Sequence, residues 1–169
     1  GLASAMFLWP NHAGGRLRRE ISAALNGCAK FFAAIFTGFM TGGMDTARLG
    51  TQRQELQQNL AQAKDTLAAA RAEPGRNPEL ARCFLELNLV SGRIFDLLLT
   101  LEAAASQSSP RGRQQAIKGE LSALAGQVED TMHHLAGALG GHGASQGLPD
   151  LMESIQVIRG RLAMLKQQN

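Results

Sequence analysis

The stretch Arg16-Leu-Arg-Arg-Glu-Ile21-Ser-Ala-Ala-Leu-Asn-Gly-Cys28-Ala-Lys-Phe31-Phe-Ala-Ala-Ile35-Phe sets the architecture of this chain. Its apolar residues recur at alternating intervals of four and three, at Leu17, Ile21, Ala24, Cys28, Phe31 and Ile35. That interval places them along one side of an α-helix, as in a helix that buries one face against its neighbours. The stretch therefore predicts an amphipathic helix inside a helical protein.

Four further segments show the same period. The second starts near Thr46, where Asp45 is placed to cap it, and the third is the most apolar, so we expect the third at the centre of the fold. Their stripes are Leu49, Leu56, Leu60, Ala63 and Leu67; then Leu80, Phe84, Leu87, Ile94, Leu98 and Leu101, widened by Cys83, Val90 and Leu97; then Ile117, Leu121, Leu124, Val128, Met132, Leu135 and Leu139; and last Leu151, Ile155, Ile158, Leu162 and Leu165.

Short breaks separate these segments. Pro74-Gly75, the run Ser106–Gly112 and the glycine-rich run Gly140–Gly147 each end a helical pattern, and no stretch alternates with a period of two. Short connections make neighbouring helices antiparallel. We therefore predict an all-α, up-and-down antiparallel bundle of about five long helices over residues 11–169, preceded by a distinct segment at 1–10.

Composition excludes several classes of protein. The 169 residues are 44% apolar, which is typical of a globular chain, and the mean hydropathy of −0.10 argues against an integral membrane protein. The net charge is +3, but the cations are scattered among Asp and Glu, and one Trp with no Tyr offers no platform for stacking bases. Nucleic acid is therefore not an expected partner.

The opening of the chain has a distinctive order. Small and apolar residues run from Gly1 to a Trp9-Pro10 pair, and the cluster Arg16, Arg18 and Arg19 follows. A chain that leaves a bilayer shows this order: an apolar run, an aromatic residue at the interface, and then cytoplasmic cations that face anionic lipid. The run is too short to span a membrane by itself. Residues 1–10 are therefore either the end of a transmembrane helix or an ordinary buried N-terminal segment.

No arrangement of residues indicates catalysis, a metal or a cofactor. The sequence contains no Gly-x-Ser-x-Gly elbow or phosphate loop, and His133 and His134 are adjacent, so on a helix they point about 100° apart. His142 lies in the glycine-rich run. We expect no enzyme, solvated histidines, and buried free thiols at Cys28 and Cys83.

The phenylalanine-rich run leaves two interpretations open. Phe31 and Phe39 share one helix face, whereas Phe32 and Phe36 lie about 100° further round. The helix is then either covered on several sides inside the bundle, or it keeps Phe32 and Phe36 as an apolar surface for a second subunit or for a membrane part of the same chain.

The run Leu8-Trp9-Pro10-Asn-His-Ala-Gly-Gly-Arg-Leu17-Arg-Arg-Glu-Ile21, with Ala69-Ala-Ala-Arg-Ala-Glu-Pro-Gly75 and Gly92-Arg-Ile-Phe-Asp-Leu-Leu-Leu-Thr-Leu101, resembles the soluble region of the fusaric acid resistance (FUSC) or aromatic acid exporter family. The resemblance covers residues 7–105.

The resemblance implies an inner-membrane efflux protein for aromatic carboxylic acids. This chain would be the cytoplasmic helical domain between two transmembrane blocks of the same polypeptide, some relatives having a periplasmic adaptor partner. The arginines would then follow the positive-inside rule. The alternative is a ligand-sensing or adaptor bundle, such as the sensory domain of a receptor.

Overall fold

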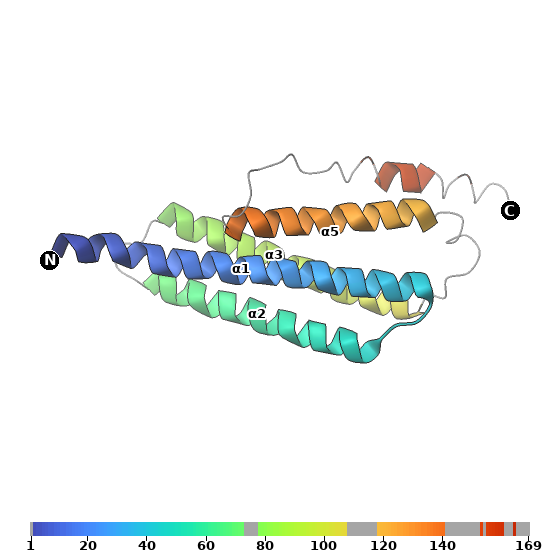
Figure 1. Ribbon diagram of the computed structural model, residues 1–169, viewed down its shortest axis with the longest axis horizontal. Helices are drawn as coiled ribbons and strands as arrows, with labels where there is room; N and C mark the ends of the chain where they lie inside the picture. The colour runs from blue at the N-terminus through green and yellow to red at the C-terminus, as the bar shows by residue number, and fades with distance from the viewer. Residues whose placement is uncertain are drawn as a thin grey trace.

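Four long helices run alternately up and down in the computed structural model (Figure 1). They are α1 (Leu2–Thr41), α2 (Thr46–Ala72), α3 (Pro78–Gln107) and α5 (Lys118–Gly140). The structure describes residues 2–72, 78–107, 118–140, 153, 155–160 and 164, with side chains from residue 15 onward except those of 78–80 and 140. Residues 155–160 form a further helical segment, and these ranges contain no strand. The predicted all-α antiparallel bundle is confirmed.

The central helix is α1. It packs against α2, α3 and α5, while α2 also packs against α3. The prediction that the third helix would be central is wrong. Apolar content alone does not reveal how many neighbours a helix has, and α3 leaves part of its apolar surface uncovered.

The stripe predicted on α1 forms the core. All six of its residues are buried, with exposed fractions of 0–1%. The Phe31 ring lies against Phe95 of α3, with 6.4 Å between ring centroids, a separation typical of paired aromatic rings. On α2, the predicted Leu49, Leu56, Ala63 and Leu67 are buried as well. The registers of α1 and α2 therefore follow directly from their periodicity.

The corner between α1 and α2 is fixed by glycine and by a cap. Gly42 has a φ of 73°, and the Gly43 amide donates to the Gly38 carbonyl at 3.1 Å, which together form a Schellman motif that ends α1. The Asp45 side chain then accepts a hydrogen bond from the Arg48 amide at 3.0 Å. The predicted cap at Asp45 is confirmed.

Glycine also sets the approach of α2 to α1. A Cβ placed on Gly27 would lie 3.1 Å from Cδ1 of Leu56, which is itself only 1% exposed. On the other side of α1, the Ser22 hydroxyl donates to the Ala136 carbonyl of α5 at 2.8 Å. Small residues thus let two helices lie close to α1.

The register of α3 differs from the prediction. Its core face carries Phe84, Phe95 and Leu98. The other predicted core residues Val90, Leu97 and Leu101 are 49%, 69% and 39% exposed. Cys83 is exposed too, so the expectation that it is a buried thiol is wrong. The predicted stripe merged two faces of the helix, only one of which meets α1 and α2.

In α5 the most deeply buried positions are the small residues Ala125 and Ala136, while Leu135 is 36% exposed. Ile158 of the last helical segment is buried, as predicted, whereas Ile155, predicted on the same stripe, is 36% exposed, so that prediction is wrong. The remaining predictions lie outside the described residues or side chains: those for Leu80, Ile117, Leu151, Leu162 and Leu165, the turn at Pro74-Gly75, the glycine-rich run, and the side chains of residues 1–10.

Candidate functional site

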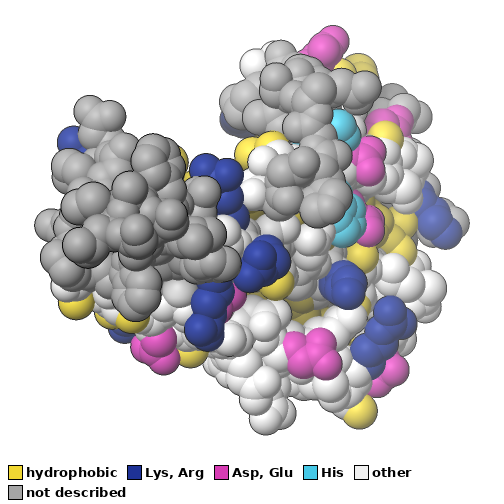
Figure 2. Space-filling view, turned by 60° about the vertical axis from the view of Figure 1, so that its left-hand side comes forward, with side chains coloured by type: hydrophobic (Ala, Val, Ile, Leu, Met, Phe, Trp, Pro, Cys, Tyr) yellow, Lys and Arg dark blue, Asp and Glu magenta, His cyan; other side chains and the backbone are white. Residues whose placement is uncertain are grey.

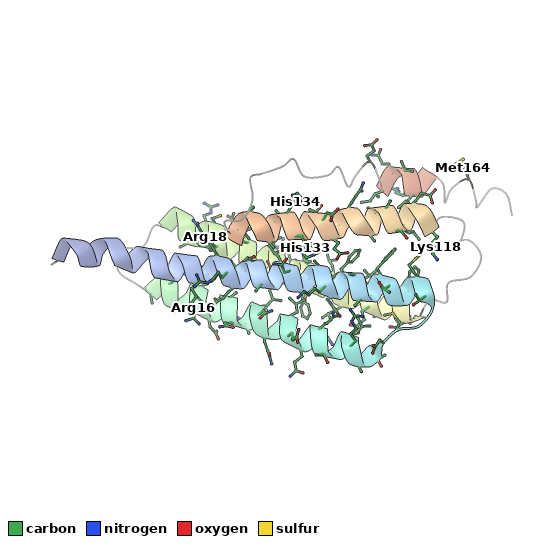
Figure 3. All side chains as sticks on the ribbon, in the orientation of Figure 1. Arg16, Arg18, Lys118, His133, His134 and Met164 are labelled. Carbon is green, nitrogen blue, oxygen red and sulfur yellow. The ribbon has the colours of Figure 1, made fainter. Side chains whose placement is uncertain are left out.

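The three predicted arginines surround α1 near one end of the bundle. Arg16, Arg18 and Arg19 are exposed, and Leu17 between them is 1% exposed in the core. Arg16 and Arg18 lie on opposite sides of the helix (Figure 3), as residues two positions apart must. The three side chains therefore form an arginine girdle (Arg16, Arg18, Arg19) around the exposed part of α1.

Most of the charge of the girdle is uncompensated within the described residues. Arg16 pairs with Glu20 one turn later, at 2.8 Å between Nε and Oε1. No ion pair involves Arg18 or Arg19 in the part of the chain that the structure describes. Two guanidinium groups are thus available for an anionic surface.

The girdle lies where α1 leaves the bundle. α1 is helical from Leu2 onward without a break at Pro10, and its first turns project beyond the ends of the other helices (Figure 1). The last turn of α2 brings Arg71 to the same end, and the start of α3 brings Arg82. Figure 2 turns this end forward and shows Lys and Arg side chains across it. The end of the bundle from which α1 projects is therefore basic.

Within the described ranges, one segment of α1, Gly15–Thr41, is long and apolar enough to cross a membrane by length and composition. The core helix of a bundle has the same composition, and this segment packs against three other helices.

Phe32 and Phe36, the predicted subunit contact, lie against the core. Phe32 is 9% exposed, and the Phe36 ring stacks on it with 6.1 Å between centroids and is itself half-buried. This geometry favours the interpretation of α1 as an inner helix covered on several sides. Little of either ring is left for a second subunit.

The histidines of α5 have unlike surroundings. The Nδ1 of His133 donates to Oδ1 of Asn26 on α1 at 2.8 Å, and its Nε2 lies 3.8 Å from Glu129, while His134 is exposed. His133 thus links α5 to α1, a contact that the sequence did not reveal. No group of three His, Cys, Asp or Glu side chains able to hold a metal occurs among the described residues, and His142 lies outside them.

The two cysteines differ in environment. Burial raises the pKa of the Cys28 thiol to about 12, so this thiol stays protonated and unreactive at neutral pH. Cys83 lies exposed on α3. Only Cys28 is the buried free thiol that the sequence predicted.

Two seams along α2 open into hollows that sequence reasoning missed. The seam with α1 encloses about 330 Å³ beside Asn26 and Gln52, and the seam with α3 encloses about 560 Å³ beside Asn88. Buried oxygens of Gln52 and Asn88 accept no hydrogen bond from the described residues. The only signal of these hollows in the sequence was the presence of the amide residues Asn26, Gln52 and Asn88. Such residues also occur on helix faces exposed to solvent.

No family model matches the chain, and no curated protein or solved structure matches it either.

Proposed function

We propose that this chain is the cytoplasmic helical domain of an inner-membrane efflux transporter of the fusaric acid resistance type, which exports aromatic carboxylic acids. The domain serves the assembly or the coupling of two transmembrane blocks in the same polypeptide. A periplasmic adaptor would act through the membrane part. The observation that carries the proposal is the arginine girdle on α1.

The girdle supports the proposal through its position on an unbroken helix. A transmembrane helix that continued into α1 would bring Arg16, Arg18 and Arg19 to the lipid headgroups of the cytoplasmic leaflet. There each cation contributes about 1 kcal/mol of attraction to anionic lipid, and the attraction falls off within a Debye length.

Vesicle co-sedimentation tests this orientation. The chain should bind phosphatidylglycerol vesicles, bind phosphatidylcholine vesicles much less, and dissociate in high salt. Replacing Arg16, Arg18 and Arg19 together with glutamine should weaken binding roughly 100-fold, since about 3 kcal/mol of attraction is lost.

A matched triple variant supplies the control. Replacing Arg48, Arg53 and Lys118 with glutamine removes the same charge from sites away from the girdle and should leave most of the binding intact. Equal losses in the two variants would mean that net charge alone drives binding, and the proposed orientation would be wrong. The transporter assignment itself is tested by the flanking gene sequence, which should encode two blocks of several hydrophobic 20-residue segments.

One observation favours the alternative of a ligand-sensing or adaptor bundle. The seam between α2 and α3 combines apolar Leu60 and Leu85 with Lys64, Arg93 and the unsatisfied oxygen of Asn88. A flanking gene sequence with one hydrophobic helix on each side would favour this second function over transport.

A further inference from the structure

The exposed face of α3 carries a continuous apolar stripe. We define the outer stripe as Cys83, Val90, Leu97 and Leu101, which follow one another at intervals of seven, seven and four and so lie on one side of the helix. The three large side chains are 49%, 69% and 39% exposed in chain order. This stripe is separate from the face of α3 that packs on α1 and α2.

The spacing of the stripe fits another helix as its cover. Half-buried Leu87 and Ile94, which also pack against the core of this chain, alternate with Cys83, Val90 and Leu97, so apolar residues occur every three or four positions from 83 to 101. This is the a/d pattern of a coiled coil, in which each apolar side chain inserts between four residues of a facing helix. At 1.5 Å per residue the stripe extends over about 27 Å.

We infer that the outer stripe is an interface between two copies of this chain, with the two α3 helices antiparallel across a twofold axis. Glu86 and Arg93 lie seven residues apart along the solvent edge of the stripe; Glu86 also pairs with Arg82 of its own helix at 3.1 Å between exposed side chains, and Arg93 borders the seam with α2. In the antiparallel arrangement Glu86 of each copy faces Arg93 of the other, whereas a parallel pair would bring like charges level. The antiparallel arrangement therefore pairs opposite charges across the interface.

The inference is independent of the proposed membrane orientation. The outer stripe runs along α3 from Cys83 to Leu101. Arg16 and Arg18 of the arginine girdle lie near one end of the bundle (Figure 3). A bundle with that end against a membrane still presents α3 to a neighbouring copy. The interface also differs from the one expected at Phe32 and Phe36, which the core covers in this structure.

Sedimentation velocity of the full chain over a range of concentrations tests the inference. The chain should form a dimer, and Leu97→Glu should weaken the dimer at least about 100-fold because it places a charge against the partner copy's Cys83 within the apolar interface. Leu97 is exposed in the single chain, so the thermal midpoint of the monomer should not fall. Leu89→Glu is the matched control, because Leu89 is 54% exposed on α3 but lines the seam with α2 instead.

Charge exchange tests the antiparallel pairing. Glu86→Arg and Arg93→Glu should each weaken the dimer roughly tenfold, and the double variant should recover wild-type affinity. Labelling of Cys83 should be fast in the monomer and slow in the dimer. The inference would be overturned if the chain were strictly monomeric, or if Leu97→Glu and Leu89→Glu weakened the dimer equally. It would also be overturned if the chain were monomeric and Leu97→Glu abolished its binding to vesicles. If the double variant did not recover wild-type dimer affinity, the antiparallel pairing would be wrong.

Discussion

Replacing Gly27 with alanine tests the packing that places α1 at the centre. In a helix interior this change alone stabilises by about 1 kcal/mol, because alanine loses less backbone entropy. Here the new Cβ would lie 3.1 Å from Cδ1 of Leu56, which is 1% exposed and has no solvent to move into. Overpacking of this kind costs about 1–3 kcal/mol. We therefore expect a net change between zero and about 2 kcal/mol of destabilisation, measured by urea denaturation at constant m-value.

Gly126→Ala is the control for helix propensity. No atom lies within 4 Å of a Cβ placed at Gly126 of α5, so the full gain of about 1 kcal/mol should appear. The two substitutions are chemically the same and differ only in what the new methyl group contacts. Their measured effects should differ by about 1–3 kcal/mol.

A double-mutant cycle separates the contact from other causes. Leu56→Ala removes the side chain that the new Cβ meets and by itself costs about 2–5 kcal/mol. Combined with Gly27→Ala it should cost less than the sum, with a coupling of about 0.5–3 kcal/mol. If Gly27→Ala stabilises the protein as much as Gly126→Ala does, and its effect adds to that of Leu56→Ala, then α2 does not approach α1 at Gly27.

Four further predictions concern other parts of the bundle. Phe31→Ala should destabilise the protein by about 3–5 kcal/mol in urea titrations, because it removes a fully buried ring that contacts Phe95. Asp45→Ala should cost about 1 kcal/mol through loss of the cap on α2, whereas Asp45→Asn should retain it. Removing residues 1–9 should leave the thermal midpoint unchanged, since the first turns of α1 project beyond the other helices. A large fall in the midpoint would mean that this segment belongs to the core. Burial raises the pKa of the Cys28 thiol from 9.0 to about 12, so the folded state keeps a proton that the unfolded chain loses. Stability should therefore be intact below pH 9 and fall as the pH rises toward 12, and Cys28→Ala should remove that part of the decline in alkaline denaturation.

The sequence predicted the register of α1 and α2 because each carries a stripe narrow enough to define one face. Leu17, Ile21 and Leu56 lie where a period of 3.6 places them, and Asp45 caps α2 as its position indicates. The register of α3 was harder to predict, because its apolar residues cover more than one side of the helix. Periodicity cannot tell which side of such a helix meets a neighbour, so Cys83 and Leu97 were assigned to the core.

The candidate site was predictable in position but not in its contacts. The cluster Arg16, Arg18 and Arg19 is evident in the sequence, yet its pairing through Glu20 and its place at the projecting end of α1 required the structure. The contact between His133 and Asn26 joins residues 107 positions apart, and no local pattern encodes it. Long-range pairings of single polar side chains leave no periodic trace in a sequence.

The central place of the first helix has a consequence for synthesis on the ribosome. α1 is made first, but the partner that covers its Ser22 side is α5, which ends at residue 140. At about 5–20 residues per second, the roughly 100 residues between the end of α1 and the end of α5 take on the order of 5–20 s to emerge. Until then only α2 and α3 can cover the stripe of α1, so the nascent chain presents apolar surface to solvent. A chaperone that binds short apolar helices should therefore crosslink to α1 in chains stalled before residue 118 and release it once α5 has emerged.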